Sequence, residues 1–189
     1  MTQSNAFKFL RKIGLNYSEG EYGRISFLNI LKKIIKKYRN AFLLKYCMYS
    51  VFLSPLNPRF LRPKFWRLMG CKIGKNVFIG TSVMMDAGNA SLIELEDNVH
   101  IASHSILLCH QRDLSEYFLG DDYAKLPYIR KNILLKKGCL VGTNSLVMPG
   151  VTIGEGAIIG AGSLVTKDIP AWAIATGRPA KVVQHIRNK

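Results

Sequence analysis

The stretch that decides the fold is residues 135–170, LKKGCLVGTNSLVMPGVTIGEGAIIGAGSLVTKDIP, which divides into six consecutive groups of six residues. Each group begins with an aliphatic residue, and the fifth position of the first five groups is small or β-branched. The leading residues are Leu135, Val141, Val147, Ile153, Ile159 and Val165, and the second set is Cys139, Ser145, Val151, Ala157 and Ser163. An amphipathic helix repeats at about 3.6 residues and a half-buried strand at about 2, so neither explains a strict period of six.

A solenoid of short strands joined by turns does explain this period. Each hexad would supply one side of a coil, with its leading residue inside, and stacked coils would bury one another's edges. Hexads in the same frame also begin at Ile73 and Leu95, but their offset is not a multiple of six, so residues 86–94 must contain an irregularity. About a dozen hexads at three per turn predict roughly four coils of a mainly β fold.

The run VMPGVTIGEGAIIGAGSLVTKDIP and the later GRPAK resemble the hexapeptide-repeat acyltransferases, which have a left-handed parallel β-helix. The resemblance is greatest to the branch that O-acetylates sugars and bacterial surface polysaccharides. It covers residues 67–185 and implies a β-helix domain there, with a short C-terminal tail, a helical extension at 1–66 and an inserted loop at 111–131. It also implies acetyl-CoA as acyl donor, a sugar or glycan precursor as acceptor, and a homotrimer with active sites between subunits.

The stretch ILLCHQRD, residues 106–113, ends the earlier run of hexads at His110. The resemblance implies that His110 is the catalytic base, because the family has a histidine where the chain leaves the coil for an inserted loop. Acetyl transfer from a thioester to a hydroxyl requires removal of the hydroxyl proton, and the ordinary pKa of histidine lies near the working pH. A carboxylate should orient the ring, and Asp113 and Asp86 are the candidates. We interpret Cys109 as a small buried hydrophobic residue rather than a nucleophile.

The resemblance also places coenzyme A in a groove between neighbouring β-helices. By matching position, the residues that would line it are Gly142, Asn144, Gly160, Ala161 and Thr166, with Lys167, Arg178 and Lys181 facing the phosphates. Small residues let a ligand pack on the coils, and cations suit phosphate groups. Cys139 stands where many relatives have a tryptophan that packs on the ligand. The loop at 111–131 is rich in Asp and Tyr, which suit sugar hydroxyls, so we expect it to form part of the acceptor site.

Positive charge is concentrated at the front of the chain. Residues 1–69 hold 14 Lys and Arg against 2 Glu, a net charge of +12, whereas residues 70–189 hold 13 against 10 acidic residues, a net charge of +3. Residues 26–39 place apolar and basic side chains on opposite faces of a helix, with Ser26 as N-cap. A short apolar helix is expected over 41–53, too short to span a bilayer, which requires about 20 residues. Residues 25–54 are therefore either a membrane-surface anchor or a helical cap on the first coil.

Three other functions are each compatible with part of the sequence. Transfer to an amino sugar uses the same base chemistry and stays open. A γ-carbonic-anhydrase-like or non-catalytic protein would suit the repeat alone, but His100 and His104 occupy different places in their hexads and lack the spacing of that family, so we expect no metal. A nucleic-acid-binding module would explain the basic front, but no interleaved aromatic motif is present, so we expect no nucleic-acid partner.

Four widely spaced cysteines without a CxxC pair indicate neither a zinc site nor a secreted disulfide framework. The chain begins without the pattern of a signal peptide. We therefore expect a cytoplasmic protein, located peripherally on the inner face of the membrane if residues 25–54 bind lipid.

Overall fold

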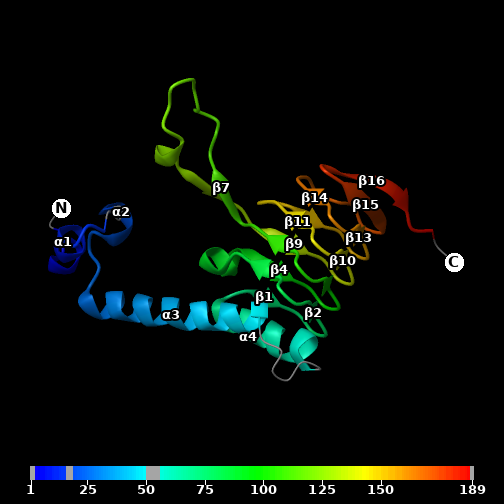
Figure 1. Cartoon of the computed structure of the whole chain (residues 1–189), viewed down its shortest axis with the longest axis horizontal. Helices are drawn as coiled ribbons and strands as arrows, with labels where there is room; N and C mark the ends of the chain where they lie inside the picture. The colour runs from blue at the N-terminus through cyan, green and yellow to red at the C-terminus, as the bar shows by residue number, and fades with distance from the viewer. Residues whose placement is uncertain (1–2, 16–18, 50–55, 188–189) are drawn as a thin grey trace. The chain divides into compact units, whose positions relative to one another are not determined.

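The computed structural model describes residues 3–15, 19–49 and 56–187, shown in Figure 1. The chain divides into two compact units, residues 1–42 and 43–189. The boundary between the units lies at residue 42, whereas the expected boundary between the helical extension and the β-helix domain was at residue 66. The difference arises because residues 43–49, the end of a helix, pack in the core of the β-structure. Residues 50–54, the last part of the stretch considered for membrane contact, lie outside the described residues.

The first unit is helical. It contains α1 (Asn5–Lys12), α2 (Glu19–Tyr22) and most of α3 (Phe27–Tyr49). Ser4 caps α1, since its hydroxyl oxygen accepts a hydrogen bond from the backbone N–H of Phe7 and donates one to the carbonyl of Ile25 at 2.7 Å. Phe7 and Leu10 of α1 are buried. The apolar side chains of α1 are thus the buried centre of this small helical unit.

Helix α3 is a single helix of 23 residues, so the prediction of a basic helix followed by a separate apolar one was wrong. No proline or glycine lies between Phe27 and Tyr49 to end it. Ser26 is confirmed as the N-cap, because its hydroxyl accepts from the backbone N–H of Asn29 at 3.3 Å. Within the described residues, no helix combines the length and the apolar character needed to cross a membrane.

The second unit begins with a helical cap on the first coil. The cap consists of the end of α3, the π-helical turn η2 (Asn57–Leu61) and α4 (Arg62–Met69), and side chains of α3 and α4 belong to the same apolar core as the β-strands. Trp66 is completely buried. The guanidinium of Arg62, only 5% exposed, donates to the carbonyls of Cys47 and Ile79, both at 3.1 Å. The structure therefore shows that residues 43–49 and 56–69 form a helical cap on the first coil.

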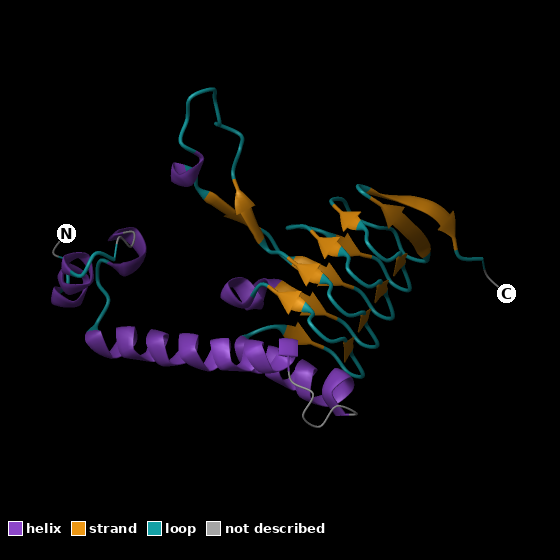
Figure 2. Cartoon of the chain, in the orientation of Figure 1, coloured by secondary structure: helices purple, strands orange, loops and turns teal. Residues whose placement is uncertain are grey.

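Short parallel strands build the rest of this unit (Figure 2). Consecutive strands enter a first, a second and a third sheet in turn, and each pairs with the strand one coil away. The first sheet contains β1 (Lys72–Ile73), β4 (Ile93–Leu95), β9 (Ile133–Leu135) and β12 (Thr152–Ile153). The second contains β2 (Phe78–Ile79), β5 (His100–Ile101), β10 (Leu140–Val141) and β13 (Ile158–Ile159), followed by β15 (Ala173–Gly177) and β16 (Ala180–His185). The third contains β3 (Met84–Met85), β6 (Ile106–Leu107), β11 (Leu146–Val147) and β14 (Leu164–Val165).

The interior of the coils follows the hexad pattern. Every leading residue from Leu135 to Val165 is buried, and so is the second, smaller residue of each hexad. Ser145 and Ser163 are tolerated inside because each hydroxyl donates to the carbonyl of Gly160, at 3.1 and 2.6 Å. The predicted parallel solenoid of about four coils is confirmed for the described residues.

Two segments leave the six-residue period. Residues 86–94, where an irregularity was predicted, contain the 3₁₀ helix η3 (Ala87–Leu92). The insertion after His110 is a hairpin of β7 (His110–Arg112) and β8 (Tyr128–Arg130), with the 3₁₀ turn η4 (Tyr123–Lys125) between them. Figure 2 shows this hairpin projecting from the stacked coils.

Candidate active site

His110 is placed where the chain leaves the third sheet. The side chain before it, Cys109, points into the core and is fully buried, as predicted. The backbone N–H of Lys131 donates to the carbonyl of Cys109 at 2.9 Å and so closes the base of the hairpin. His110 is thereby held at the junction between the rigid coils and the hairpin, with its side chain 36% exposed.

Asp86 lies directly against this histidine. Its Oδ2 is 2.5 Å from Nδ1 of His110, and its side chain is only 6% exposed. The same oxygen accepts from the Asn89 amide at 3.0 Å and from the backbone N–H of Cys109 at 3.3 Å. The carboxylate is therefore fixed on several sides and can orient one edge of the imidazole ring.

The network also sets the ionisation of Asp86. Burial alone would raise the pKa of this carboxyl group. The hydrogen bonds from His110 and Asn89, the interaction with the imidazole and the N–H of Cys109 outweigh burial and lower the pKa below its ordinary value. Asp86 is accordingly a carboxylate at neutral pH.

Stacking of the coils explains why residues so far apart meet. Strands β3 and β6 are neighbours in the third sheet, with Met85 opposite Leu107. The backbone N–H of Asp86 continues this ladder by donating to the carbonyl of Leu107 at 3.1 Å. Asp86 then caps η3, since its side chain accepts from the backbone N–H of Asn89. The break in the hexad period thus holds Asp86 and Asn89 beside His110.

Asp113, the other candidate carboxylate, lies elsewhere. Its Oδ1 accepts from the backbone N–H of Ser115 at 3.0 Å and from its hydroxyl at 2.7 Å, which forms a local turn in the hairpin. These bonds, with a smaller effect from the charge of Lys131, lower the pKa of Asp113. The structure therefore brings His110 together with Asp86 and not with Asp113.

The hairpin contributes an aromatic wall that the sequence did not identify residue by residue. The ring of Tyr128 meets His110 edge to face, with ring centroids 5.4 Å apart. On the same strand pair, the guanidinium carbon of Arg112 lies 3.9 Å from the Tyr128 ring centroid. Asn89 and Tyr128 were both missed, because neither belongs to the hexad pattern or to the resemblance.

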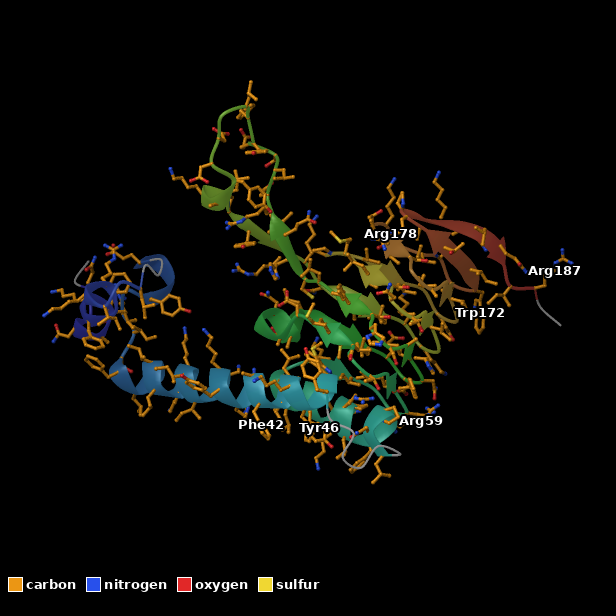
Figure 3. The ribbon with its side chains drawn as sticks, in the orientation of Figure 1. Phe42, Tyr46, Arg59, Trp172, Arg178 and Arg187 are labelled. Atoms are coloured by element: carbon orange, nitrogen blue, oxygen red, sulfur yellow. The ribbon has the colours of Figure 1, made fainter. Side chains whose placement is uncertain are left out.

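Five of the residues predicted to hold coenzyme A gather at the corner between the second and third sheets. Gly142 and Asn144 belong to one coil and Gly160 and Ala161 to the next. The backbone N–H of Gly162 donates to Thr143, which stacks the two turns. Arg178, labelled in Figure 3 on the turn between β15 and β16, donates to the carbonyl of Gly162 at 3.2 Å. A cation therefore lies beside a corner made of small residues.

Of the other three predicted residues, Thr166 and Lys167 lie apart from this corner, whereas Lys181 lies beside it, because its partner Thr176 is next to Gly160. Thr166 and Lys167 follow β14, at the opposite end of the third sheet, and both are exposed. Lys181 is exposed on β16, opposite Thr176 of β15. The predicted set therefore lies on both sides of the third sheet rather than forming one cluster.

The chain is similar in sequence to known transferases. The family model described as bacterial transferase hexapeptide (six repeats) matches residues 132–167, which are the hexads of the last two complete coils. Residues 132–167 therefore carry the repeat of the hexapeptide transferases. Galactoside O-acetyltransferase of Lactococcus lactis is 33% identical over 137 residues, which are 68% of this chain and 61% of the relative. YvoF of Bacillus subtilis is 28% identical over 162 residues, covering 86% of this chain and 81% of that protein.

A solved structure gives a similar result. AntD, an N-acyltransferase from Bacillus cereus crystallised as a mutant with dTDP-4-amino-4,6-dideoxyglucose and coenzyme A, has a TM-score of 0.55 and 27% identity. The alignment covers 62% of this chain and 64% of AntD. The hexapeptide-repeat chain thus spans a little under two thirds of both AntD and the galactoside enzyme.

The repeat places two other histidines, His100 and His104, away from His110. The ring of His100, on the outer face of the second sheet, stacks on Phe78 with centroids 4.0 Å apart. Burial, followed by the nearby charge of Arg59, lowers the pKa of His100. His104 is at a turn with φ of 63°. Throughout the described part of the hexapeptide-repeat chain, no group of three or more His, Cys, Asp or Glu side chains is arranged to hold a metal ion.

Proposed function

We propose that this protein is an acetyl-CoA-dependent O-acetyltransferase that acts on a hydroxyl of a sugar or a bacterial surface glycan precursor, with His110 as general base. The observation that carries the proposal is the contact between Nδ1 of His110 and Oδ2 of Asp86. A histidine that is oriented by a buried carboxylate and partly exposed at a junction between scaffold and insertion has the arrangement of a base.

The chemistry follows from the roles of the two ring nitrogens. An ionised carboxylate can only accept hydrogen bonds, so Nδ1 carries the proton directed at Asp86, and Nε2 is left as the basic nitrogen. The acceptor oxygen attacks the thioester carbonyl carbon while Nε2 takes the hydroxyl proton. The carbon–sulfur bond breaks, and the proton passes from Nε2 to the departing sulfur. The negative charge of Asp86 stabilises the imidazolium between these steps.

The corner residues support acetyl-CoA as the donor. The small side chains of Gly142, Gly160 and Ala161 leave backbone close to the surface, where a thin pantetheine arm would bind. Arg178 at this corner, with Lys167 and Lys181, would hold the phosphates of coenzyme A. When bound, acetyl-CoA supplies the activated acetyl group, and Asn144 and Thr166 would contact it from the two ends of the third sheet.

The relatives indicate the acceptor class. One named relative is a galactoside O-acetyltransferase, and the similar solved structure, AntD, is an N-acyltransferase crystallised with an amino sugar. Transfer to a sugar amine is therefore the second candidate, since His110 would remove a proton from an ammonium or amine in the same place. The hairpin, with Tyr128 against His110, would form the acceptor wall.

Two further parts of the proposal rest on the resemblance alone, and a third rests on the sequence pattern of α3. We take the coil to be left-handed, and the functional form to be a homotrimer with each site completed by a neighbouring subunit. We also take the exposed apolar face of α3, flanked by lysines, to contact the inner face of the membrane, which would bring a cytoplasmic enzyme to lipid-linked acceptors.

The proposed function is tested by thiol release from acetyl-CoA with a panel of neutral, acidic and amino sugars. His110→Ala should reduce turnover by about 10²–10⁴-fold, the usual contribution of a general base, with an unchanged melting temperature. Full activity in this variant would remove His110 from the mechanism. Product analysis of the acetylated sugar decides between oxygen and nitrogen transfer.

A further inference from the structure

A second polar depression adjoins the site. We name it the first-sheet groove, and its volume is about 500 Å³. It lies on the outer face of the first sheet, and the residues that define it here are Lys72, Leu92, Glu94, Arg130, Lys131 and Leu134. They come from the sheet, from η3 and from the base of the hairpin. Arg130 and Lys131 lie in the loop at 111–131 that was expected to form part of the acceptor site, whereas the other four were not predicted as site residues.

The charges of this groove are unbalanced. Lys72 and Glu94 form an ion pair, with Nζ and Oε2 3.2 Å apart. Arg130 and Lys131 form no salt bridge with any described residue, although Lys131 lies near enough to Asp113 to affect its pKa. Two adjacent cations therefore face the groove without a carboxylate partner of their own, and they are the groups that an anion would bind.

The side chain of Lys131 packs against Gly150 on the neighbouring coil. A side chain added at Gly150 would meet Cδ of Lys131 at 2.9 Å and its Cβ at 3.4 Å. The aliphatic part of Lys131 therefore lies on the turn at Gly150, although the residue as a whole is exposed. Its ammonium group is accessible to an anion in the groove.

Two structural elements link the groove to the candidate active site. Arg130 is the residue directly opposite His110 in the β7–β8 pair, and directly opposed residues project to the same face of a hairpin. Leu92 ends η3, the same short helix whose Asn89 contacts Asp86. A molecule in the groove would therefore reach towards His110.

We propose that the first-sheet groove binds an anionic substituent of the acceptor, a phosphate or a carboxylate, while its sugar ring lies on Leu92 and Leu134. This inference rests on the proposed function, since it names the class of acceptor for the same site. The planar guanidinium of Arg130 can donate two hydrogen bonds to either anion, and Lys131 adds a compact positive charge. A neutral sugar gains neither interaction.

Direct binding to the full-length chain, without acetyl-CoA, tests the groove separately from catalysis. Calorimetric titrations would use glucose 1-phosphate, glucuronate and glucose as probes. The variant combines Arg130→Gln with Lys131→Met. A matched control combines Lys136→Met with Lys137→Gln, which removes two exposed positive charges outside the groove. His110→Ala is titrated as well.

At least one acidic probe should bind more tightly than glucose, and its affinity should fall by about tenfold or more in the groove variant. The control should bind as the natural chain does, and His110→Ala should still bind the acidic probe more tightly than glucose. The comparison of phosphate with carboxylate identifies the anion. Equal binding of glucose, equal binding to the groove variant, or no binding of either acidic probe would each overturn the proposal. Loss of turnover in His110→Ala with retained binding separates this result from the test of the proposed function.

Discussion

The imidazole Nδ1 of His110 lies 2.5 Å from Oδ2 of Asp86, although the two residues are 24 positions apart in the sequence. One turn of the coil brings them together, because β3 and β6 are adjacent strands of the third sheet. The pairing depends on two departures from the hexad period: η3 after Asp86 and the hairpin that begins at His110. The regular coils supply rigidity, and the irregular segments supply the reactive groups.

The first prediction compares two isosteric substitutions. Asp86→Asn should reduce turnover by about 10²–10⁴-fold, because an amide that donates to Nδ1 would favour the tautomer with the proton on Nε2. Asp113→Asn should leave turnover within about threefold of the natural chain, since this carboxylate bonds only to Ser115 in the local turn. Steady-state assays of both variants check this. Equal losses in the two variants would contradict the assignment of Asp86.

The second prediction concerns stability at acid pH. The folded-state pKa of Asp86 is below its ordinary value of 3.8, so the carboxylate stabilises the fold above pH 3.8. This contribution is lost as the pH falls through the lowered folded-state pKa. The free energy of unfolding of the natural chain, relative to Asp86→Asn, should therefore be constant near neutral pH and decrease below pH 3.8. Urea unfolding at a series of pH values measures it; a difference that stayed constant on acidification would refute the prediction.

The third prediction concerns the corner at Gly142. A Cβ there would lie 2.6 Å from both the backbone nitrogen of Ala161 and the carbonyl oxygen of Ile159. Gly142→Ala should therefore destabilise the fold by about 1–3 kcal/mol, because neither backbone can move without shifting a whole coil. Gly88→Ala is the control, since its Cβ would meet Asp86 at an ordinary 3.5 Å. Thermal melting of both variants gives the comparison, and an equal melting temperature for the two would show that the coils can separate at this corner.

The fourth prediction concerns the cap on the first coil. Arg62→Met should reduce the free energy of unfolding by about 2–5 kcal/mol, because it leaves the buried carbonyls of Cys47 and Ile79 without their donor. Arg59, labelled in Figure 3, is exposed and donates to Asn76 at 2.8 Å. Arg59→Met should change stability by less than about 0.5 kcal/mol. Denaturant titrations test the pair; similar losses would indicate that the cap does not depend on the buried position of Arg62.

The fifth prediction concerns α3. Seven large apolar side chains between residues 27 and 42 are 44–75% exposed, among them Leu31, Ile35 and Phe42. The double change Leu31→Gln and Ile35→Gln should abolish flotation with vesicles that contain phosphatidylglycerol, because it removes apolar contact and leaves the lysines. Leu119→Gln, in the fully exposed tip of the hairpin, serves as control. Absence of flotation by the natural chain would sink the membrane proposal.

The solenoid was predictable from the sequence because its packing is periodic. Each leading residue from Leu135 to Val165 fills the interior of its own coil. An aliphatic residue therefore recurs every six positions, and this period can be recognised from the sequence alone. The position of the irregularity at 86–94 was also predictable, since the frames before and after it do not match. Its conformation was not, because a change of frame does not specify a 3₁₀ helix capped by Asp86.

The choice between Asp86 and Asp113 shows why the site was only partly predictable. Asp113 is nearer to His110 in the sequence, but in β7 and the following turn its side chain reaches Ser115 instead. Asp86 is distant in the sequence but adjacent in the stack. The continuity of α3 past Asn40 was missed for a related reason, since a change from basic to apolar composition does not end a helix in the absence of proline or glycine.

All four cysteine side chains lie in the core, and burial raises the pKa of each thiol to about 12. Alkylating reagents attack thiolates, so these four groups should resist maleimides at neutral pH while the fold is intact. A cysteine introduced at an exposed position, such as Leu119 or Tyr38, would then be the group that takes up a spin label or a fluorophore. Labels for distance measurements between the hairpin and the basic helix can therefore be attached to introduced cysteines without first replacing the four natural ones.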